Sequence, residues 1–96
     1  MEFLEETNSA NIIEVWVEER GRKSDTYISG WDIDEIELKK NLKLIKKNRG
    51  CNGSIKEIIK EAGKVKVLQL QGNHRDYVIE YIKNTGIDES IIKIKL

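Results

Sequence analysis

The fold is decided between Gly50 and Arg75, by two segments that read Gly50-Cys51-Asn52-Gly53-Ser54 and Leu68-Gln69-Leu70-Gln71-Gly72-Asn73-His74-Arg75. The first combines two glycines with an Asn-Gly pair, which is typical of a helix end followed by a turn. The second begins with alternating apolar residues and ends in Gly-Asn, which indicates a strand that gives way to a helix. We therefore expect the backbone to change direction in both segments.

A helix is predicted before the first turn, over residues 35–48. Its apolar positions follow helical spacing and predict a buried stripe of Leu38, Leu42 and Ile45. Asp32 and Asp34 precede it as candidate N-caps, and they lack the ligand order of an EF-hand. The adjoining flank carries the lysines Lys39, Lys40, Lys43, Lys46 and Lys47. A solvated surface and a polyanion-binding surface both fit this flank, and the lack of interspersed glutamates favours polyanion binding.

A hairpin is predicted near the N-terminus, with apolar alternation over residues 12–17 and a return strand over residues 26–31. Residues 19–25 form the predicted loop, in which a glycine permits a turn. The cations at the tip are Arg20, Arg22 and Lys23. Trp16 and Tyr27 fall on the side away from the core. They can pair across the strands or offer a stacking platform to a base, and the cross-strand pair is the more common arrangement.

Residues 54–60 and 64–71 are predicted as two further strands, joined near Gly63. In the second of them the apolar alternation slips between Val67 and Leu68. Such a slip predicts either a bulge or burial on both faces of the sheet.

A second helix is predicted with Asn73 as N-cap, Asp76 at its third position and Gly86 as its stop. Its apolar stripe consists of Val78, Tyr81 and Ile82. Apolar alternation over residues 92–96 then predicts a closing strand. The expected fold class is α+β: a two-layer α/β sandwich with a five-stranded mixed sheet and two helices on one face, in the order β-β-α-β-β-α-β.

The 96 residues suffice for one domain with one core. Residues 1–11 are acidic and lack periodicity, so we expect a short flexible tail before a domain over residues 12–96. No apolar run reaches the roughly 18–20 residues of a membrane span and no secretory signal is evident, so an intracellular location is expected. The net charge is zero, but acids and bases are segregated along the chain, which indicates a polyanionic partner.

Cys51 and His74 are the side chains most suggestive of catalysis. Each is the only residue of its type, so neither a disulfide nor a zinc site is predicted. Cys51 has no nearby base, and His74 has no serine or cysteine at a plausible motif spacing. We therefore expect both to be packed structural side chains in a protein that is not an enzyme and needs no cofactor or metal.

The two turn segments closely resemble the signature of the translation initiation factor 1 family, which the eukaryotic factor shares with archaeal relatives. The matching residues are Cys51, Asn52, Gly53 and Ser54 in the first segment and Leu68, Gln69, Leu70, Gln71, Gly72, Asn73, His74 and Arg75 in the second, followed by a helix that ends at Gly86. The resemblance also includes the Gly21-Arg22-Lys23 loop and the lysine-rich helix, and it covers residues 12–96. The chain departs from the family in its short acidic tail and in a longer segment between Ser54 and Val67.

The resemblance implies a cytoplasmic, monomeric factor that binds the small ribosomal subunit near the P site, close to mRNA and initiator tRNA, and alongside other initiation factors. Accurate start-codon selection would follow from competition with fully seated initiator tRNA. The implied rRNA contacts are Arg20, Arg22, Lys23, Lys39, Lys40, Lys43, Lys46 and Lys47. The implied tRNA-facing loop consists of Lys60, Glu61, Ala62, Gly63 and Lys64.

Two other functions remain open. A related RNA-binding domain acts in reinitiation or ribosome recycling, as in density-regulated protein, where it normally belongs to a longer chain. A protein-interaction module could instead use Trp16 and Tyr27. A small enzyme such as an acylphosphatase would need a phosphate-cradling loop with an arginine and a positioned asparagine, and the sequence has no such motif.

Overall fold

The computed structural model describes residues 12–60 and 63–95. The elements follow in the order β1 (Ile13–Arg20), β2 (Lys23–Ser29), α2 (Glu35–Arg49), β3 (Gly53–Lys60), β4 (Gly63–Gln71), α3 (Arg75–Asn84), the 3-10 helix η1 (Glu89–Ile91) and β5 (Ile92–Ile94). The expected order β-β-α-β-β-α-β is confirmed, and η1 is an addition that the sequence pattern did not indicate. The tail expected over residues 1–11 lies outside the described residues.

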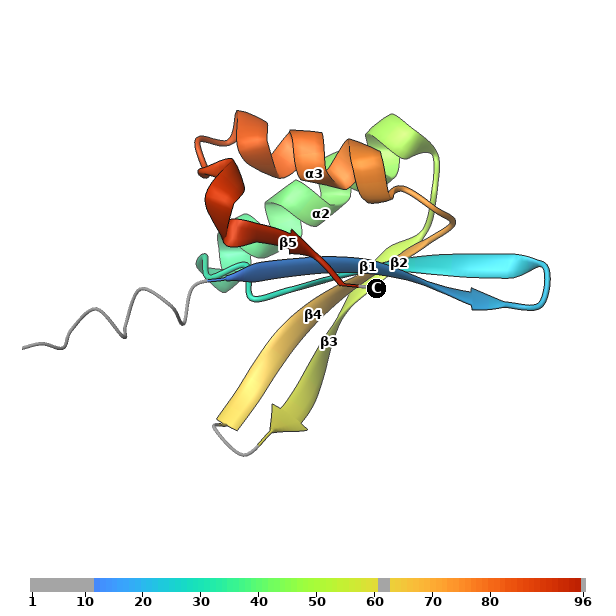
Figure 1. Ribbon diagram of the computed structural model, residues 1–96, viewed down its shortest axis with the longest axis horizontal. Coiled ribbons are helices and arrows are strands. Elements are labelled where there is room, and N and C mark those ends of the chain that lie inside the picture. Colours follow the sequence, from blue (N-terminus) through green and yellow to red (C-terminus); the bar gives the residue numbers. More distant parts are fainter. Residues whose placement is uncertain (1–11, 61–62, 96) are drawn as a thin grey trace, which may run out of the picture.

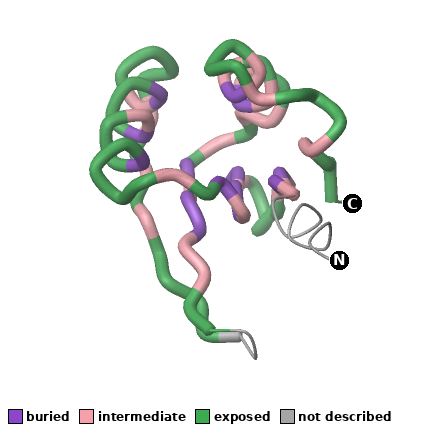
Figure 2. The backbone as a smooth tube through the Cα atoms, turned by 90° about the vertical axis from the view of Figure 1, so that its left-hand side faces the viewer, coloured by how far each residue is buried: buried purple, intermediate pink, exposed green. Residues whose placement is uncertain are grey.

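The strands form one mixed sheet in the order β3-β4-β2-β1-β5. Neighbouring strands are antiparallel except β1 and β5, which run parallel with Ile13 opposite Ile92. Helices α2 and α3 lie over the same face of the sheet, and no helix of the described residues covers the opposite face (Figures 1 and 2). The predicted two-layer sandwich is therefore confirmed.

The core lies between the sheet and the two helices. Strand side chains alternate between faces, so the sheet contributes every second residue, namely Ile13, Val15, Ile28, Leu68 and Leu70. The helices contribute Leu38, Leu42, Ile45, Val78 and Ile82. The stripe predicted for α2 is thus confirmed. Tyr81, predicted in the stripe of α3, is only half-buried and donates its hydroxyl to Asn41 Oδ1 at 2.7 Å.

The predicted loop over residues 19–25 is wrong, because the β1–β2 ladder continues almost to the hairpin tip. Arg20 pairs with Lys23, which leaves a turn of only Gly21 and Arg22 between the strands. Gly21 has a φ of 63°, which a side-chain-bearing residue adopts at a cost, so the glycine permits this tight turn. The ends of β1 and β2 consist of polar residues and so lack the apolar alternation from which strands are predicted. The backbone hydrogen bonds of the ladder do not depend on that alternation.

The slip in β4 reflects burial on both faces. The registers of β4 with β3 and with β2 run without interruption, so no bulge is present between these strands. Val67 and Leu68 are neighbours whose side chains point to opposite faces, and both are buried. Of the two explanations offered by the sequence, two-sided burial is the one confirmed.

The ends of α2 agree with the sequence pattern only in part. Gly50 ends the helix in the left-handed conformation, with a φ of 60°, and its N–H donates to the Lys46 carbonyl. At the other end Asp34 occupies the N-cap position, but its side chain makes no capping hydrogen bond. Glu35 and Glu37 lie in the first turn, where they complement the positive end of the helix dipole.

Candidate nucleic-acid interface

A basic groove lies where the tip of the β1–β2 hairpin meets the C-terminal end of α2. It has a volume of about 670 Å³. Its lining residues are Arg20, Arg22, Lys23, Ser24, Asp25, Lys46, Lys47, Gly50, Cys51, Asn52, Gln71 and Gly72. Cations from two elements that are distant in sequence therefore converge on one concave surface, which suits a polyanion.

One carboxylate interrupts the cations of the basic groove. Asp25 is 2% exposed, and Arg20 Nη2 lies 2.6 Å from its Oδ2. No described residue makes a hydrogen bond to Asp25 Oδ2. The contact with Arg20 is therefore an ion pair whose geometry is not that of a hydrogen bond. Asp25 thus neutralises Arg20, whereas Arg22, Lys23, Lys46 and Lys47 form no salt bridge with any described acid.

The floor of the basic groove comes from the glycine-rich turns. Backbone hydrogen bonds join them: the Gln71 N–H donates to the Asn52 carbonyl at 2.9 Å, and the Gly72 N–H donates to the Ser24 carbonyl at 2.7 Å. Gly53 must be glycine, because a Cβ there would lie 2.7 Å from the Gln69 carbonyl oxygen. The sequence assigned these turns a structural role, and the structure shows that they also line the groove.

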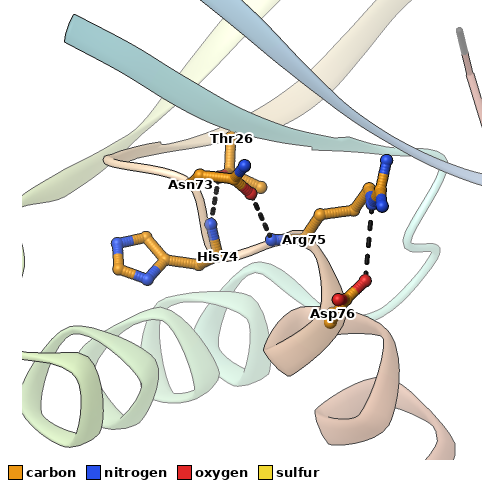
Figure 3. Close-up of polar contacts among 5 residues, drawn as sticks. All are labelled: Thr26, Asn73, His74, Arg75 and Asp76. Atoms are coloured by element: carbon orange, nitrogen blue, oxygen red, sulfur yellow. Dashed lines mark hydrogen bonds and ion pairs between the residues drawn. The ribbon is translucent and has the colours of Figure 1, made fainter.

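The junction between β4 and α3 is tied to β2 by the buried hydroxyl of Thr26. Thr26 Oγ1 donates to the Gly72 carbonyl at 2.6 Å and accepts the His74 N–H at 2.8 Å. The prediction of Asn73 as N-cap is wrong: His74 occupies that position and α3 begins at Arg75. Asn73 Oδ1 accepts the Arg75 N–H at 3.3 Å, so the amide still binds the start of the helix, one residue earlier than a cap would (Figure 3).

The expected capping box is also absent. Asp76 is the second residue of α3 rather than the third, because the helix starts one residue later than predicted. Its carboxylate faces Arg75 instead, with Oδ1 3.4 Å from Nε (Figure 3). The tertiary bond from Thr26 to the His74 N–H has displaced the local cap that the sequence pattern favoured.

The surroundings of His74 and Cys51 are consistent with the structural role predicted for both. Arg49 Nε donates to His74 Nδ1 at 3.2 Å, and His74 Nε2 lies 2.8 Å from the Gln71 carbonyl oxygen, so both ring nitrogens have a partner within the chain. The Arg49 guanidinium also lies 4.9 Å from the Tyr77 ring centroid, which commits this cation to packing. Burial raises the pKa of the Cys51 thiol above its ordinary value of 9.0, which disfavours the reactive thiolate.

Trp16 and Tyr27 stack on each other across β1 and β2, with ring centroids 5.4 Å apart and planes 15° apart. Lys95 Nζ lies 4.8 Å from the Trp16 ring centroid. The cross-strand pair is therefore confirmed. Within the described residues no helix is long and apolar enough to cross a membrane, and no group of three or more acidic, cysteine or histidine side chains is placed to hold a metal.

A family model described as translation initiation factor SUI1 matches residues 9–88 of the chain. The chain belongs to the SUI1 family of translation initiation factors. The resemblance found in the sequence is thus confirmed, and the members of this family are initiation factors rather than enzymes.

Similar SUI1-family proteins occur in yeast and archaea. Eukaryotic translation initiation factor eIF-1 of Saccharomyces cerevisiae is 37% identical over 92 residues, which cover 94% of this chain and 82% of the yeast protein. The protein translation factor SUI1 homolog of Sulfolobus acidocaldarius is 35% identical over 89 residues, covering 92% of this chain and 82% of that protein. The homolog of Thermococcus gammatolerans is 30% identical over 96 residues, covering 99% and 90% respectively.

In this SUI1-family chain the predicted rRNA contacts divide into two groups. The first group lines the basic groove and consists of Arg20, Arg22, Lys23, Lys46 and Lys47. The second group, Lys39, Lys40 and Lys43, is exposed one to two turns earlier on α2. Lys39, Lys43 and Lys47 are four residues apart, so the lysines continue along one side of the helix for about 12 Å from the groove.

The predicted tRNA-facing loop lies elsewhere in the molecule. Lys60 ends β3 and pairs with Gly63 at the start of β4, while Glu61 and Ala62 lie outside the described residues. The groove is at the other end of these strands, about 24 Å away by strand length. The β3–β4 hairpin and the β1–β2 hairpin also point in different directions (Figure 1). The two predicted regions therefore do not form one site.

Sequence reasoning missed three polar side chains at the basic groove and its edge. Asp25 and Ser24 were assigned to a loop, and Gln71 was assigned a structural role only. Asp25 could have been found from the hairpin register, because a tight turn at Gly21 places a buried acid close to Arg20. No local pattern marks Gln71 as a groove residue.

Proposed function

We propose that this chain is a cytoplasmic translation initiation factor that binds the small ribosomal subunit near the P site and promotes accurate start-codon selection. Membership of the SUI1 family supports the role in initiation. The observation that carries the binding mode is the basic groove, in which cations from the hairpin and from α2 converge. Structured rRNA is the polyanion that such a surface fits in this setting.

The proposed mechanism involves no covalent chemistry. Groove cations neutralise rRNA phosphates and release counterions, so affinity falls steeply with salt. The loop at residues 60–64 faces initiator tRNA. The factor and a correctly paired tRNA prefer different states of the subunit, and pairing shifts the population toward the state that releases the factor. The β1–β2 ladder extends to Arg20 and Lys23 at the hairpin tip, so little ordering of the backbone is needed on binding.

Co-sedimentation with small ribosomal subunits tests this proposal. We expect the double variant Arg22→Ala/Lys47→Ala to bind about tenfold more weakly than the wild type at near-physiological salt. Both side chains are exposed, so the fold should be retained. The matched control Lys93→Ala/Lys95→Ala loses the same charge on and just after β5, away from the hairpin tip, and should bind normally.

A start-codon reporter in cells tests the second half of the proposal. Replacing the chromosomal factor with the Arg22→Ala/Lys47→Ala variant should change the ratio of near-cognate to AUG initiation. Equal sedimentation of the groove and control variants would refute the groove as the binding surface. If the groove variant binds the small subunit more weakly than the control variant but the reporter ratio is unchanged, start-codon selection is refuted and ribosome binding still stands.

A further inference from the structure

We propose that the open face of the sheet beside the basic groove reads bases of single-stranded RNA, with a preference for adenine, through the side-chain amides of Asn52, Gln69 and Gln71. This inference rests on the proposed function, because the basic groove supplies the phosphate contacts. It goes beyond that function in assigning base recognition to residues outside the cationic set.

A second hollow adjoins the basic groove. It has a volume of about 290 Å³ and is lined by Asn52, Gly53, Ser54, Lys56, Gln69 and Gln71. Asn52 and Gln71 line both the hollow and the groove, so the two form one continuous surface. A strand of RNA whose phosphates lie in the groove can therefore place its bases in the hollow.

The sheet geometry aligns the amides. Leu68 and Leu70 point to the helices, so Gln69 and Gln71 point to the open face, about 7 Å apart. Ser54 is opposite Gln69, and Tyr27 is opposite Gln69 on the other side. Asn52 adjoins Gln71 through their backbone hydrogen bond. The hollow thus holds a row of neutral polar side chains, with one cation, Lys56, beside the charged groove.

These amides are available for a ligand. None of the hydrogen bonds among the described residues uses the side-chain amide of Asn52, Gln69 or Gln71. Asn52 and Gln71 are exposed, and Gln69 is partly exposed. Each amide offers a donor and an acceptor together, whereas a phosphate offers acceptors alone.

The edge of adenine is complementary to the donor and the acceptor of a side-chain amide. Asn and Gln amides bind the adenine amino group and ring nitrogen with two hydrogen bonds. In an RNA helix the deep, narrow major groove hides the base edges from protein side chains. In unpaired RNA the same edges are accessible. Stacking is a weaker explanation for base recognition here, since Tyr27 and Trp16 already stack on each other.

Fluorescence anisotropy with eight-nucleotide oligoadenylate and oligouridylate tests the inference. We expect the wild type to prefer oligoadenylate by about tenfold, the discrimination of one good bidentate contact. Gln69→Ala and Gln71→Ala should each reduce this preference and leave the salt dependence unchanged. The control Asn84→Ala removes an exposed amide at the C-terminal end of α3, outside the residues that line the hollow and the groove, and should retain the preference.

A second measurement uses the wild-type protein alone. An oligonucleotide in which purine riboside replaces adenosine lacks the 6-amino group, and it should bind no better than oligouridylate. Equal wild-type affinity for all three oligonucleotides, or an unchanged preference in both glutamine variants, would overturn the inference. In either case small-subunit binding would be intact. Loss of both oligonucleotide and small-subunit binding would instead refute the proposed function and the inference together.

Discussion

At the scale of single residues, the buried hydroxyl of Thr26 links three parts of the chain. It donates to the Gly72 carbonyl in the β4–α3 turn and accepts the N–H of His74, the N-cap of α3, and so connects both to β2. The same turn contributes Gly72 to the floor of the basic groove. One side chain thus connects the core to the candidate interface, although nothing in its sequence neighbourhood distinguishes it from any other strand threonine.

Replacing Thr26 with valine tests this link. The variant keeps the shape but leaves the Gly72 carbonyl and the His74 N–H without their partner, so we expect the free energy of unfolding to fall by about 2–3 kcal/mol. Urea denaturation measures this. Thr26→Ser retains the hydroxyl and loses one methyl group, for which about 1 kcal/mol is expected. Similar losses in both variants would show that packing, and not the hydrogen bonds, is what Thr26 supplies.

At the scale of elements, one end of α2 is anchored by ion pairs and the other lines the basic groove. At its start Glu35 meets Lys66 of β4 at 2.8 Å and Lys39 of the next turn at 3.4 Å. At its other end Lys46 and Lys47 enter the basic groove. The hydrogen bond from Lys66, followed by that from Lys39, holds the pKa of Glu35 below its ordinary value of 4.5.

The lowered pKa predicts a pH dependence of stability. A carboxyl group whose pKa is lower in the folded state stabilises the protein above its unfolded pKa, and this contribution is lost as the pH falls through the folded value. The stability difference between the wild type and Glu35→Gln should therefore be greatest near neutral pH and disappear between about pH 5 and pH 3. The effect is small because the pair is exposed.

Urea denaturation at several pH values measures the effect of Glu35→Gln. The control is Glu37→Gln, which alters the same helical turn at a carboxylate without an ion pair among the described residues. A stability difference for Glu35→Gln that stayed constant down to pH 3 would contradict the role assigned to the ion pairs of Glu35.

At the scale of the whole molecule, the candidate interface combines the hairpin, the C-terminal end of α2 and both glycine turns. The lysines of α2 outside the groove continue the positive surface along the helix. We expect Lys40→Ala/Lys43→Ala to reduce the slope of log affinity against log salt by about 2 for small-subunit binding, one unit for each lost phosphate contact. Filter binding over a salt series measures this slope. An unchanged slope would confine the interface to the groove.

The parts of the fold that were predictable are those governed by local periodicity. Leu38, Leu42 and Ile45 could be assigned to a buried helical face because an apolar stripe at this spacing has few alternatives. The end of the hairpin was not predictable in the same way, because Arg20 and Lys23 pair through backbone groups that every residue carries. The start of α3 was misplaced by one residue, because Thr26 supplies a bond from 48 residues away in sequence.

The same distinction between local pattern and long-range contact applies to the candidate site. The sequence by itself determined which residues are cationic, which glycines turn the chain, and that one helix flank bears lysines without acids. Only the tertiary structure decided that Arg22 and Lys47 share one groove with Gln71, and that Arg49 is committed to His74 and Tyr77. The physical reason is range: propensity and periodicity act over a few residues, whereas a groove depends on strand register and helix packing between distant segments.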